Sequence, residues 1–298
     1  RENEPLAAHC TFKIGGPADV FAQPETEEQL CRTIALCKEC GVKYYLLGNG
    51  SNILFEDAGY RGVVIDTTAL KMGIGILENV CHPGAAPGEV YDAVAAGAGL
   101  KLSALCTAAL ENGLTGLEFA YGIPGTVGGA VYMNAGAYGG EMKDVLASVD
   151  VLTQDLEIKT IPAAELNLGY RYSSIPEKGY IVLGATLQLK KGNIAEIRGR
   201  MAELAEQRRA KQPLQYPSAG STFKRPEGYF AGKLVQDAGL KGKTIGGAQV
   251  SEKHSGFLIN IGGATAQDIL DLIAFCQKEV KDKFGVTLET EVKIVGEE

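Results

Sequence analysis

The size and charge of the chain narrow the kinds of protein it can be. Its 298 residues suffice for two or three compact domains, and 45% hydrophobic with 22% charged residues is the balance of an ordinary soluble globular protein. The net charge of −7 argues against a general nucleic-acid binder, which would carry a basic field. No apolar run reaches the roughly 18 residues of a membrane helix, and the first residues form no signal-peptide core. We therefore expect a cytoplasmic protein that binds neither nucleic acid nor membrane.

The cysteines favour free thiols over disulfides or a metal site. There are seven, an odd number spread along the chain, which is typical of a reducing compartment. Cys37 and Cys40 have redox or zinc spacing, but they lie in the last turn of a predicted helix, the end that disfavours a thiolate. Zinc would need two more ligands, and the sequence has no second such pair and no paired histidines. We expect no metal.

Residues 1–70 have the pattern of a small β–α–β unit. A capping box at 26–29 starts a helix with one apolar face, and Gly41 ends it. Apolar strands are predicted at 42–47 and 62–66.

Residues 71–205 form a second unit of mixed pattern. Alternating or apolar runs predict strands, and a helical period closed by Asn-Gly predicts a short helix before a glycine-rich stretch. The expected strands are 89–95, 148–153 and 180–189, and the expected helix is 102–111.

The remainder, 206–298, reads as a third unit. A helix over 193–211 leads into it and ends in a basic turn, which suits a helix C-terminus. Two prolines in 212–219 indicate a hinge. A later helix is capped at Thr265 and stopped by Gly285, and a final strand over 286–294 alternates apolar and charged residues.

Two glycine-rich loops are the most informative feature of the sequence. Eight glycines fall between Gly116 and Gly140, and Gly48-Asn-Gly50-Ser-Asn52 ends an apolar strand. Glycine lets a backbone approach a ligand closely, and successive free N–H groups bind anions. Tight hairpins are the alternative interpretation. Two such loops suit a ligand with two phosphates.

Neither loop carries the usual nucleotide fingerprint. Ile53 stands where the third glycine of a Rossmann motif belongs, and no helical pattern follows it. No Gly-Lys-Ser/Thr follows either, so a P-loop is excluded. A nucleotide bound by these loops therefore sits in a different fold.

Four motifs, in this order, carry a resemblance to a known family: 11–19 (TFKIGGPAD), 47–52 (LGNGSN), 122–129 (GIPGTVGG) and 288–296 (LETEVKIVG). Over nearly its whole length the chain resembles the bacterial UDP-N-acetylenolpyruvoylglucosamine reductases. The resemblance implies a cytoplasmic flavoenzyme of peptidoglycan synthesis. In that family NADPH reduces non-covalent FAD, which then reduces the enolpyruvyl group of UDP-N-acetylglucosamine enolpyruvate to give UDP-N-acetylmuramate.

The resemblance also implies a fold and a set of cofactor ligands. The fold is α+β, a two-subdomain FAD-binding fold of the vanillyl-alcohol-oxidase/PCMH type plus a C-terminal α/β substrate-binding domain. The FAD-binding subdomains correspond to 1–70 and 71–205, the substrate domain corresponds to 206–298, and a return of its last strand to the first subdomain stays open. The expected FAD ligands are Gly48, Asn49, Gly50, Ser51, Asn52, Gly122, Ile123, Pro124, Gly125, Thr126, Gly128, Gly129, Asn134, Gly136, Ala137 and Arg225.

Three residues are candidates for the catalytic set. Taken alone, Arg171 could hold a carboxylate or simply cover a tyrosine, Ser221 could be a turn residue, and Glu291 could be solvated. No Gly-x-Ser-x-Gly elbow surrounds Ser221, which disfavours hydrolase chemistry. The resemblance implies that Arg171, with Glu291 held protonated by burial, stabilises an enolate-like carboxylate and that Ser221 donates a proton.

The resemblance implies substrate contacts at four further positions. Lys211 matches a lysine that meets the substrate diphosphate, and Tyr170 and Lys224 flank catalytic residues. His254 stands where some relatives have Gln. Arg225 stands where some have Asn, so we expect it to reach flavin phosphate instead.

The spacing of two motifs indicates a branch of the family. Ser221 follows Arg171 by 50 residues, an interval similar to the branch that lacks an extra tyrosine loop. Another segment must then shield the site. Two other functions stay open: an FAD-dependent oxidase of the same superfamily, and a flavin-binding sensor without catalysis. The order of the three catalytic motifs argues against the oxidase, and the presence of the complete catalytic set argues against the sensor.

Overall fold

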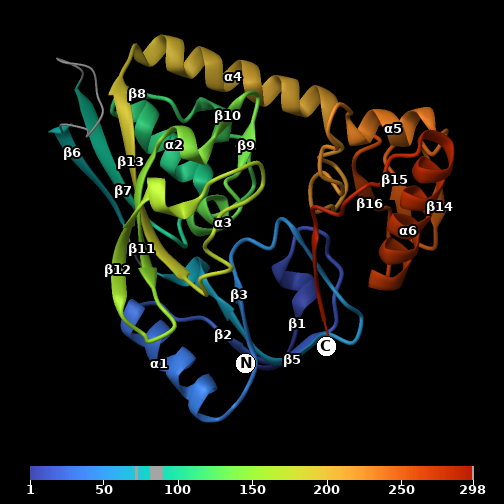
Figure 1. Ribbon diagram of the computed structural model, residues 1–298, viewed down its shortest axis with the longest axis horizontal. Helices are drawn as coiled ribbons and strands as arrows, with labels where there is room; N and C mark the ends of the chain where they lie inside the picture. The colour runs from blue at the N-terminus through green and yellow to red at the C-terminus, as the bar shows by residue number, and fades with distance from the viewer. Residues whose placement is uncertain (71–72, 81–89, 297–298) are drawn as a thin grey trace.

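The computed structural model of the chain describes residues 1–70, 73–80 and 90–296. Two sheet-based units lie next to each other, and a long helix, α4, runs from the second of them to a smaller C-terminal unit (Figure 1). None of the helices within the described ranges combines the length and apolarity that a bilayer span requires. The helices are α1 (Glu27–Glu39), α2 (Leu102–Glu111), α3 (Val127–Tyr132), α4 (Ile194–Lys211), α5 (Ala231–Asp237) and α6 (Ala266–Phe284).

The first unit contains the predicted β–α–β arrangement. Its sheet has the order β1-β2-β5-β3, in which β2, β5 and β3 run parallel and β1 is antiparallel at the edge. Thr26 is the N-cap of helix α1, and its side chain accepts a hydrogen bond from the Gln29 backbone N–H at 3.2 Å, which is one half of the predicted capping box. The Gln29 side chain accepts from the Glu25 N–H at 2.7 Å instead of from Thr26. The strands are β1 (Glu2–Pro5), β2 (Pro17–Ala22), β3 (Tyr44–Leu47), β4 (Ile53–Phe55) and β5 (Tyr60–Asp66).

The second unit is built on an antiparallel sheet of order β12-β11-β13-β7-β6, with β8 also paired to β13. Helices α2 and α3 pack on this sheet in one apolar core. The expected strand 89–95 corresponds to β7, although Glu89 lies outside the described residues. The strands are β6 (Ile74–Val80), β7 (Tyr91–Gly97), β8 (Leu114–Thr115), β11 (Leu146–Leu152), β12 (Ile158–Pro162) and β13 (Ile181–Lys191), beside a small pair of β9 (Gly136–Ala137) and β10 (Gly140–Glu141).

The C-terminal unit combines two helices with a three-stranded antiparallel sheet, β14 (Thr244–Ile245), β15 (Ala248–Val250) and β16 (Leu258–Asn260). Thr265 and Asp268 form the predicted capping box of α6. Gly285 ends that helix with φ +70°, a conformation that glycine adopts without steric cost.

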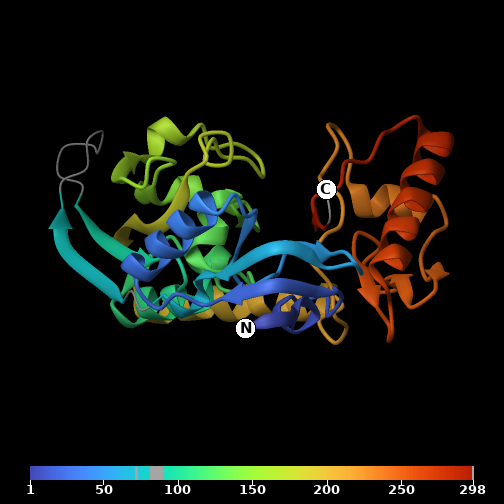
Figure 2. The ribbon, with the colours of Figure 1, turned by 90° about the horizontal axis from the view of Figure 1, so that it is seen from below.

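The end of the chain returns to the first unit. Strand β17 (Lys293–Val295) pairs in parallel with β4, and Figure 2 shows the C-terminal unit on the opposite side of the molecule from β6 and β7. The predicted strand over 286–294 is therefore wrong for most of its length, because only its last residues find a strand partner. Residues 288–292 instead contact the segment 222–224 through an isolated bridge between Phe223 and Thr290.

The first and C-terminal units share one hydrophobic core. Phe12, Phe21 and Phe55 from the first unit lie in the same buried cluster as Leu272 and Val280 of α6. Hydrogen bonds cross the junction as well: the Asn260 side chain donates to the Phe12 carbonyl at 3.2 Å, and Asp57 accepts from the Ala266 N–H at 2.8 Å. The two units therefore form one body that α4 connects to the second sheet.

Candidate active site

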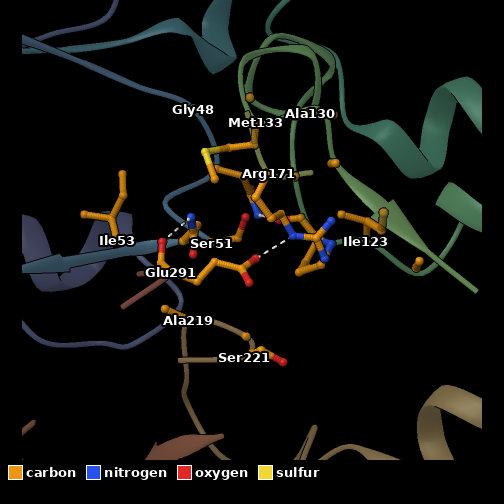
Figure 3. A pocket seen from close by; sticks show the side chains of 18 of the residues that line it. Gly48, Ser51, Ile53, Ile123, Ala130, Met133, Arg171, Ala219, Ser221 and Glu291 are labelled. Atoms are coloured by element: carbon orange, nitrogen blue, oxygen red, sulfur yellow. Dashed lines mark hydrogen bonds and ion pairs between the residues drawn. The ribbon is translucent and has the colours of Figure 1, made fainter. Parts of the chain in front are cut away.

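The two glycine loops line a single cavity of about 470 Å³ (Figure 3). The first loop follows β3 and the second runs into α3, so each lies at the end of a regular element. The Asn49 side chain donates to the Pro124 carbonyl at 2.7 Å, which holds the loops together. Residues 48–53, 123–126 and 135–138 contribute nearly half of the residues that line it.

Two glycines of the first loop, Gly48 and Gly50, have no room for a side chain. Gly50 has φ +59°, and a Cβ there would come within 2.2 Å of the His9 carbonyl oxygen. A Cβ on Gly48 would lie 2.7 Å from Thr126 Oγ1. The Oε1 atom of Gln212, which also lines the cavity, is buried without a hydrogen-bond partner among the described residues. Glycine loops on the cavity wall and an unpaired polar atom in its lining fit a large, polar, phosphate-bearing cofactor such as FAD.

Arg171 and Glu291 meet at the wall of this cavity. Arg171 Nε donates to Glu291 Oε1 at 2.7 Å, and Arg171 Nη2 donates to the Gly136 carbonyl at 3.1 Å. The side chains are only 23% and 12% exposed, so solvent screens the ion pair weakly. Figure 3 shows the pair between the glycine loops and Ser221.

Ser221 reaches the site because its segment pairs with the chain end. The Glu291 N–H donates to the Thr222 carbonyl at 2.8 Å, and the Lys224 N–H donates to the Glu289 carbonyl at 2.8 Å. Ser221 lines the first cavity and also a third cavity of about 360 Å³. The structure thus brings the three predicted catalytic residues together, from positions 120 residues apart.

The same extended pairing turns Lys224 away from the site. Alternate side chains of this segment, Ser221, Phe223 and Arg225, line the third cavity, as the period of extended backbone requires. Lys224 lies between them and pairs with Glu289 at 3.2 Å. The predicted substrate contact of Lys224 is not supported by this arrangement.

Arg225 lies in the third cavity and not with the glycine loops, so the expected contact with flavin phosphate is not supported either. Its guanidinium stacks over the Phe230 ring at 4.0 Å, and its backbone N–H donates to the Tyr170 hydroxyl at 3.2 Å. Tyr170 lines the same cavity, with the Arg171 guanidinium 5.2 Å from its ring centre. Both residues belong to the side of the site that faces away from the glycine loops.

His254 and Lys211 also reach the site. His254 lines the first and third cavities, and its Nδ1 accepts the Gly256 N–H at 3.1 Å. Burial lowers the pKa of His254, because the charged imidazolium loses its hydration there. Lys211 stands at the end of α4 and lines the first cavity.

Most predicted FAD ligands line the first cavity, but three others do not. Gly122 packs against the Arg208 side chain, and a Cβ there would lie 2.8 Å from Arg208 Cδ. A Cβ on Gly128 would lie 2.9 Å from Ala98 Cβ, so the glycine allows close contact between α3 and the chain after β7. The Asn134 side chain is fully buried and bonded to protein groups. These three residues are not part of the cavity lining and instead pack against other parts of the protein.

Sequence reasoning missed Arg208. It lines the first cavity and also a second one of about 640 Å³ that adjoins the Gly48-Asn49 backbone. Burial lowers its pKa, and its guanidinium has no hydrogen bond or ion pair to the described residues. Its spacing of three from Lys211 was the available signal, since residues three apart share a helix face. Apart from Lys211, the basic turn was interpreted as a favourable helix end.

Comparisons with known proteins agree with this site. Residues 212–295 match the model of the UDP-N-acetylenolpyruvoylglucosamine reductase C-terminal domain, and residues 18–161 match that of an FAD binding domain. UDP-N-acetylenolpyruvoylglucosamine reductase from Clostridium perfringens is 53% identical over 99% of this chain and 92% of its own length, and the one from Caldanaerobacter subterraneus is 52% identical over 99% and 93%. The crystal structure of the Thermus caldophilus reductase superposes with a TM-score of 0.79 at 36% identity, covering 99% of this chain and 98% of that one.

The fold, the glycine-lined cavity and the matched FAD domain define an FAD-dependent oxidoreductase with a two-subdomain cofactor-binding fold, as the sequence predicted. More narrowly, the chain belongs to the UDP-N-acetylenolpyruvoylglucosamine reductase family, which confirms the resemblance drawn from its motifs.

Proposed function

We propose that this protein reduces UDP-N-acetylglucosamine enolpyruvate with NADPH and that Arg171, Ser221 and Glu291 carry the second half of the reaction. FAD, when bound, supplies the hydride that it has taken from NADPH. The observation that carries the proposal is the ion pair of Arg171 and Glu291 at 2.7 Å, on the wall of the cavity lined by both glycine loops. Ser221 stands beside it, where the first and third cavities meet.

Arg171 is suited to hold the substrate carboxylate. A guanidinium has five N–H groups, and Glu291 and the Gly136 carbonyl each accept one of them. The remaining donors can bind a carboxylate whose negative charge grows as the enolpyruvyl carbon receives hydride. Glu291 accepts a hydrogen bond from Arg171 Nε and so orients the guanidinium.

Ser221 is suited to hand a proton to the carbon next to the one that receives hydride. A hydroxyl is a weak acid, so this transfer requires a strongly basic enolate and a donor that is already in place. Among the described residues no partner accepts the Ser221 hydroxyl, and the side chain is exposed to the cavities. Its proton is therefore available to a bound substrate.

The nucleotide part of the substrate fits the side of the third cavity. Tyr170, Arg225 and His254 line it, and they offer an aromatic ring, a cation and a neutral imidazole. Lys211 supplies a cation toward the substrate diphosphate. Arg208, one turn earlier on α4, lines the same two cavities as Pro124 and is suited to the cofactor's phosphates.

A separation of the two half-reactions tests the proposal. In Ser221→Ala, flavin reduction by NADPH should keep a near-normal rate, because no carbon is protonated in that half. Reoxidation by the enolpyruvyl sugar nucleotide should slow by about 100-fold or more, the usual scale for lost general acid catalysis. Ser218→Ala is the matched control, since Ser218 lines only the second cavity. Equal slowing of both halves, or reoxidation by oxygen as fast as by the sugar nucleotide in the unaltered protein, would refute the proposal.

A further inference from the structure

We propose that Asn134 is a positioning residue for Arg171, an inference that rests on the proposed catalytic role of Arg171. The residue was expected among the FAD ligands, yet its side chain has 0% exposure. Its position between the cofactor loop and the catalytic turn suggests a different task.

The side-chain amide of Asn134 makes its hydrogen bonds to other groups of the protein. Its Nδ2 donates to the Gly169 carbonyl at 2.8 Å and to Glu141 Oε2 at 2.6 Å. Its Oδ1 accepts the Lys143 N–H at 2.9 Å. A carboxamide has two N–H donors and one oxygen, so neither donor is left for a ligand.

The Gly169 carbonyl belongs to the tight turn that presents Arg171. Gly169 and Tyr172 exchange backbone hydrogen bonds of 3.0 and 3.1 Å, with Tyr170 and Arg171 at the tip. Arg171 has φ +54°, whereas Tyr170 keeps a negative φ. This is the pattern of a type II turn, in which the position of Arg171 usually belongs to glycine. A bulky residue persists in such a conformation only where its surroundings over-determine it.

The link between loop and turn runs in both directions. Asn134 holds the backbone of the turn, and Arg171 in return donates to the carbonyl of Gly136, two residues after Asn134. Asn134 itself has φ +43°, a region in which asparagine is favoured over most residues. With both links in place, the guanidinium has one orientation, toward Glu291. Loss of the amide should free the turn to relax and carry Arg171 away from the carboxylate.

A double-mutant cycle separates this role from plain stability. Asn134→Gly removes the amide and suits the positive φ, and the second half-reaction is measured in native and Arg171→Ala backgrounds. Asn134→Gly should slow reoxidation by the enolpyruvyl sugar nucleotide by about 10- to 100-fold, the scale expected when a catalytic group shifts by roughly 1 Å. NADPH-driven flavin reduction and FAD content should stay near native. In the Arg171→Ala background the same change should alter the rate by no more than about twofold.

The control is Asn260→Ala. Asn260 is 8% exposed and bonds to Phe12, Gly262 and Ala264, but it lines none of the three cavities described. It should lower the unfolding midpoint and leave both half-reactions unchanged. If Asn134→Gly fails to fold, Asn134→Asp, which keeps the size and the acceptor but loses both donors, replaces it in the cycle.

The outcomes are distinct. The inference is supported if Asn134→Gly slows reoxidation in the native background but not in the Arg171→Ala background. Rate losses that multiply in the double variant, or no slowing at all, overturn it while the proposed function stands. If the flavin of the Arg171→Ala variant is reoxidised at the native rate, the proposed role of Arg171 is wrong, and this inference is wrong with it.

Discussion

Removal of either member of the Arg171–Glu291 pair should greatly slow the second half-reaction. Removal of both should slow it little more than removal of one. With 2.7 Å between Nε and Oε1, the attraction in a medium of effective dielectric 20 is about 6 kcal/mol. Desolvation of two largely buried ions offsets most of it, so the net value of the pair is far smaller. One preorganised donor to a developing oxyanion lowers the activation barrier by about 3–4 kcal/mol. We therefore expect each of Arg171→Ala and Glu291→Gln to slow reoxidation by about 100-fold or more.

The assay is single-turnover reoxidation of the reduced flavin by the enolpyruvyl sugar nucleotide, without oxygen, in both single variants and the double variant. Residues that act as one unit lose their effect together, so the double variant should resemble the slower single variant. Flavin reduction by NADPH and FAD content serve as internal controls, because neither residue belongs to a glycine loop. Losses that multiply in the double variant, or loss of FAD from either single variant, would refute the reasoning.

Two further predictions concern the cofactor and pH. The purified protein should be yellow and release all its flavin on acid precipitation. Gly50→Ala should abolish FAD retention, because the new Cβ would lie 2.2 Å from the His9 carbonyl oxygen. The control Gly239→Ala, at φ +81° with open space around it, should keep FAD. Equal flavin contents in the two variants would contradict this prediction. Since burial lowers the folded-state pKa of His254 below its unfolded value of 6.5, its neutral form stabilises the fold fully above pH 6.5, and that stability is lost as pH falls toward the folded pKa. Urea unfolding of His254→Gln should therefore depend less on pH below 6.5 than unfolding of the native chain, and identical slopes would rule out this contribution.

Local signals in the sequence located the main elements. Thr26 and Thr265 mark helix starts by their own side-chain hydrogen bonds, and Gly285 marks a helix end by its positive φ. The glycine loops could be found for the same reason, because backbone geometry dictates the residue type. Such features depend on residues within a few positions of each other, so they can be predicted from the sequence alone.

Features that depend on distant partners are harder to predict from the sequence. The final strand was placed over 286–294 because its residues alternate, but β4 offers pairing only to 293–295. Lys224 was expected in the site since it follows Ser221 closely, and the register with 289–291 turns it outward. Asn134 lies among cofactor-loop glycines in the sequence, but Gly169, 35 positions later, takes its donor.

The pairing of β17 with β4 has a consequence for how the chain acquires its structure. More than two hundred residues must be made before the first unit can gain this strand and the apolar partners on α6. Contacts between residues so far apart in the sequence form late, because closing the long loop costs conformational entropy before the contact contributes any favourable free energy. During synthesis the emerging first unit therefore lacks the apolar partners that residues after 218 add to the cluster of Phe12 and Phe55. A fragment that stops after α4 would keep those apolar surfaces exposed, so the cofactor-binding half should aggregate when it is made alone.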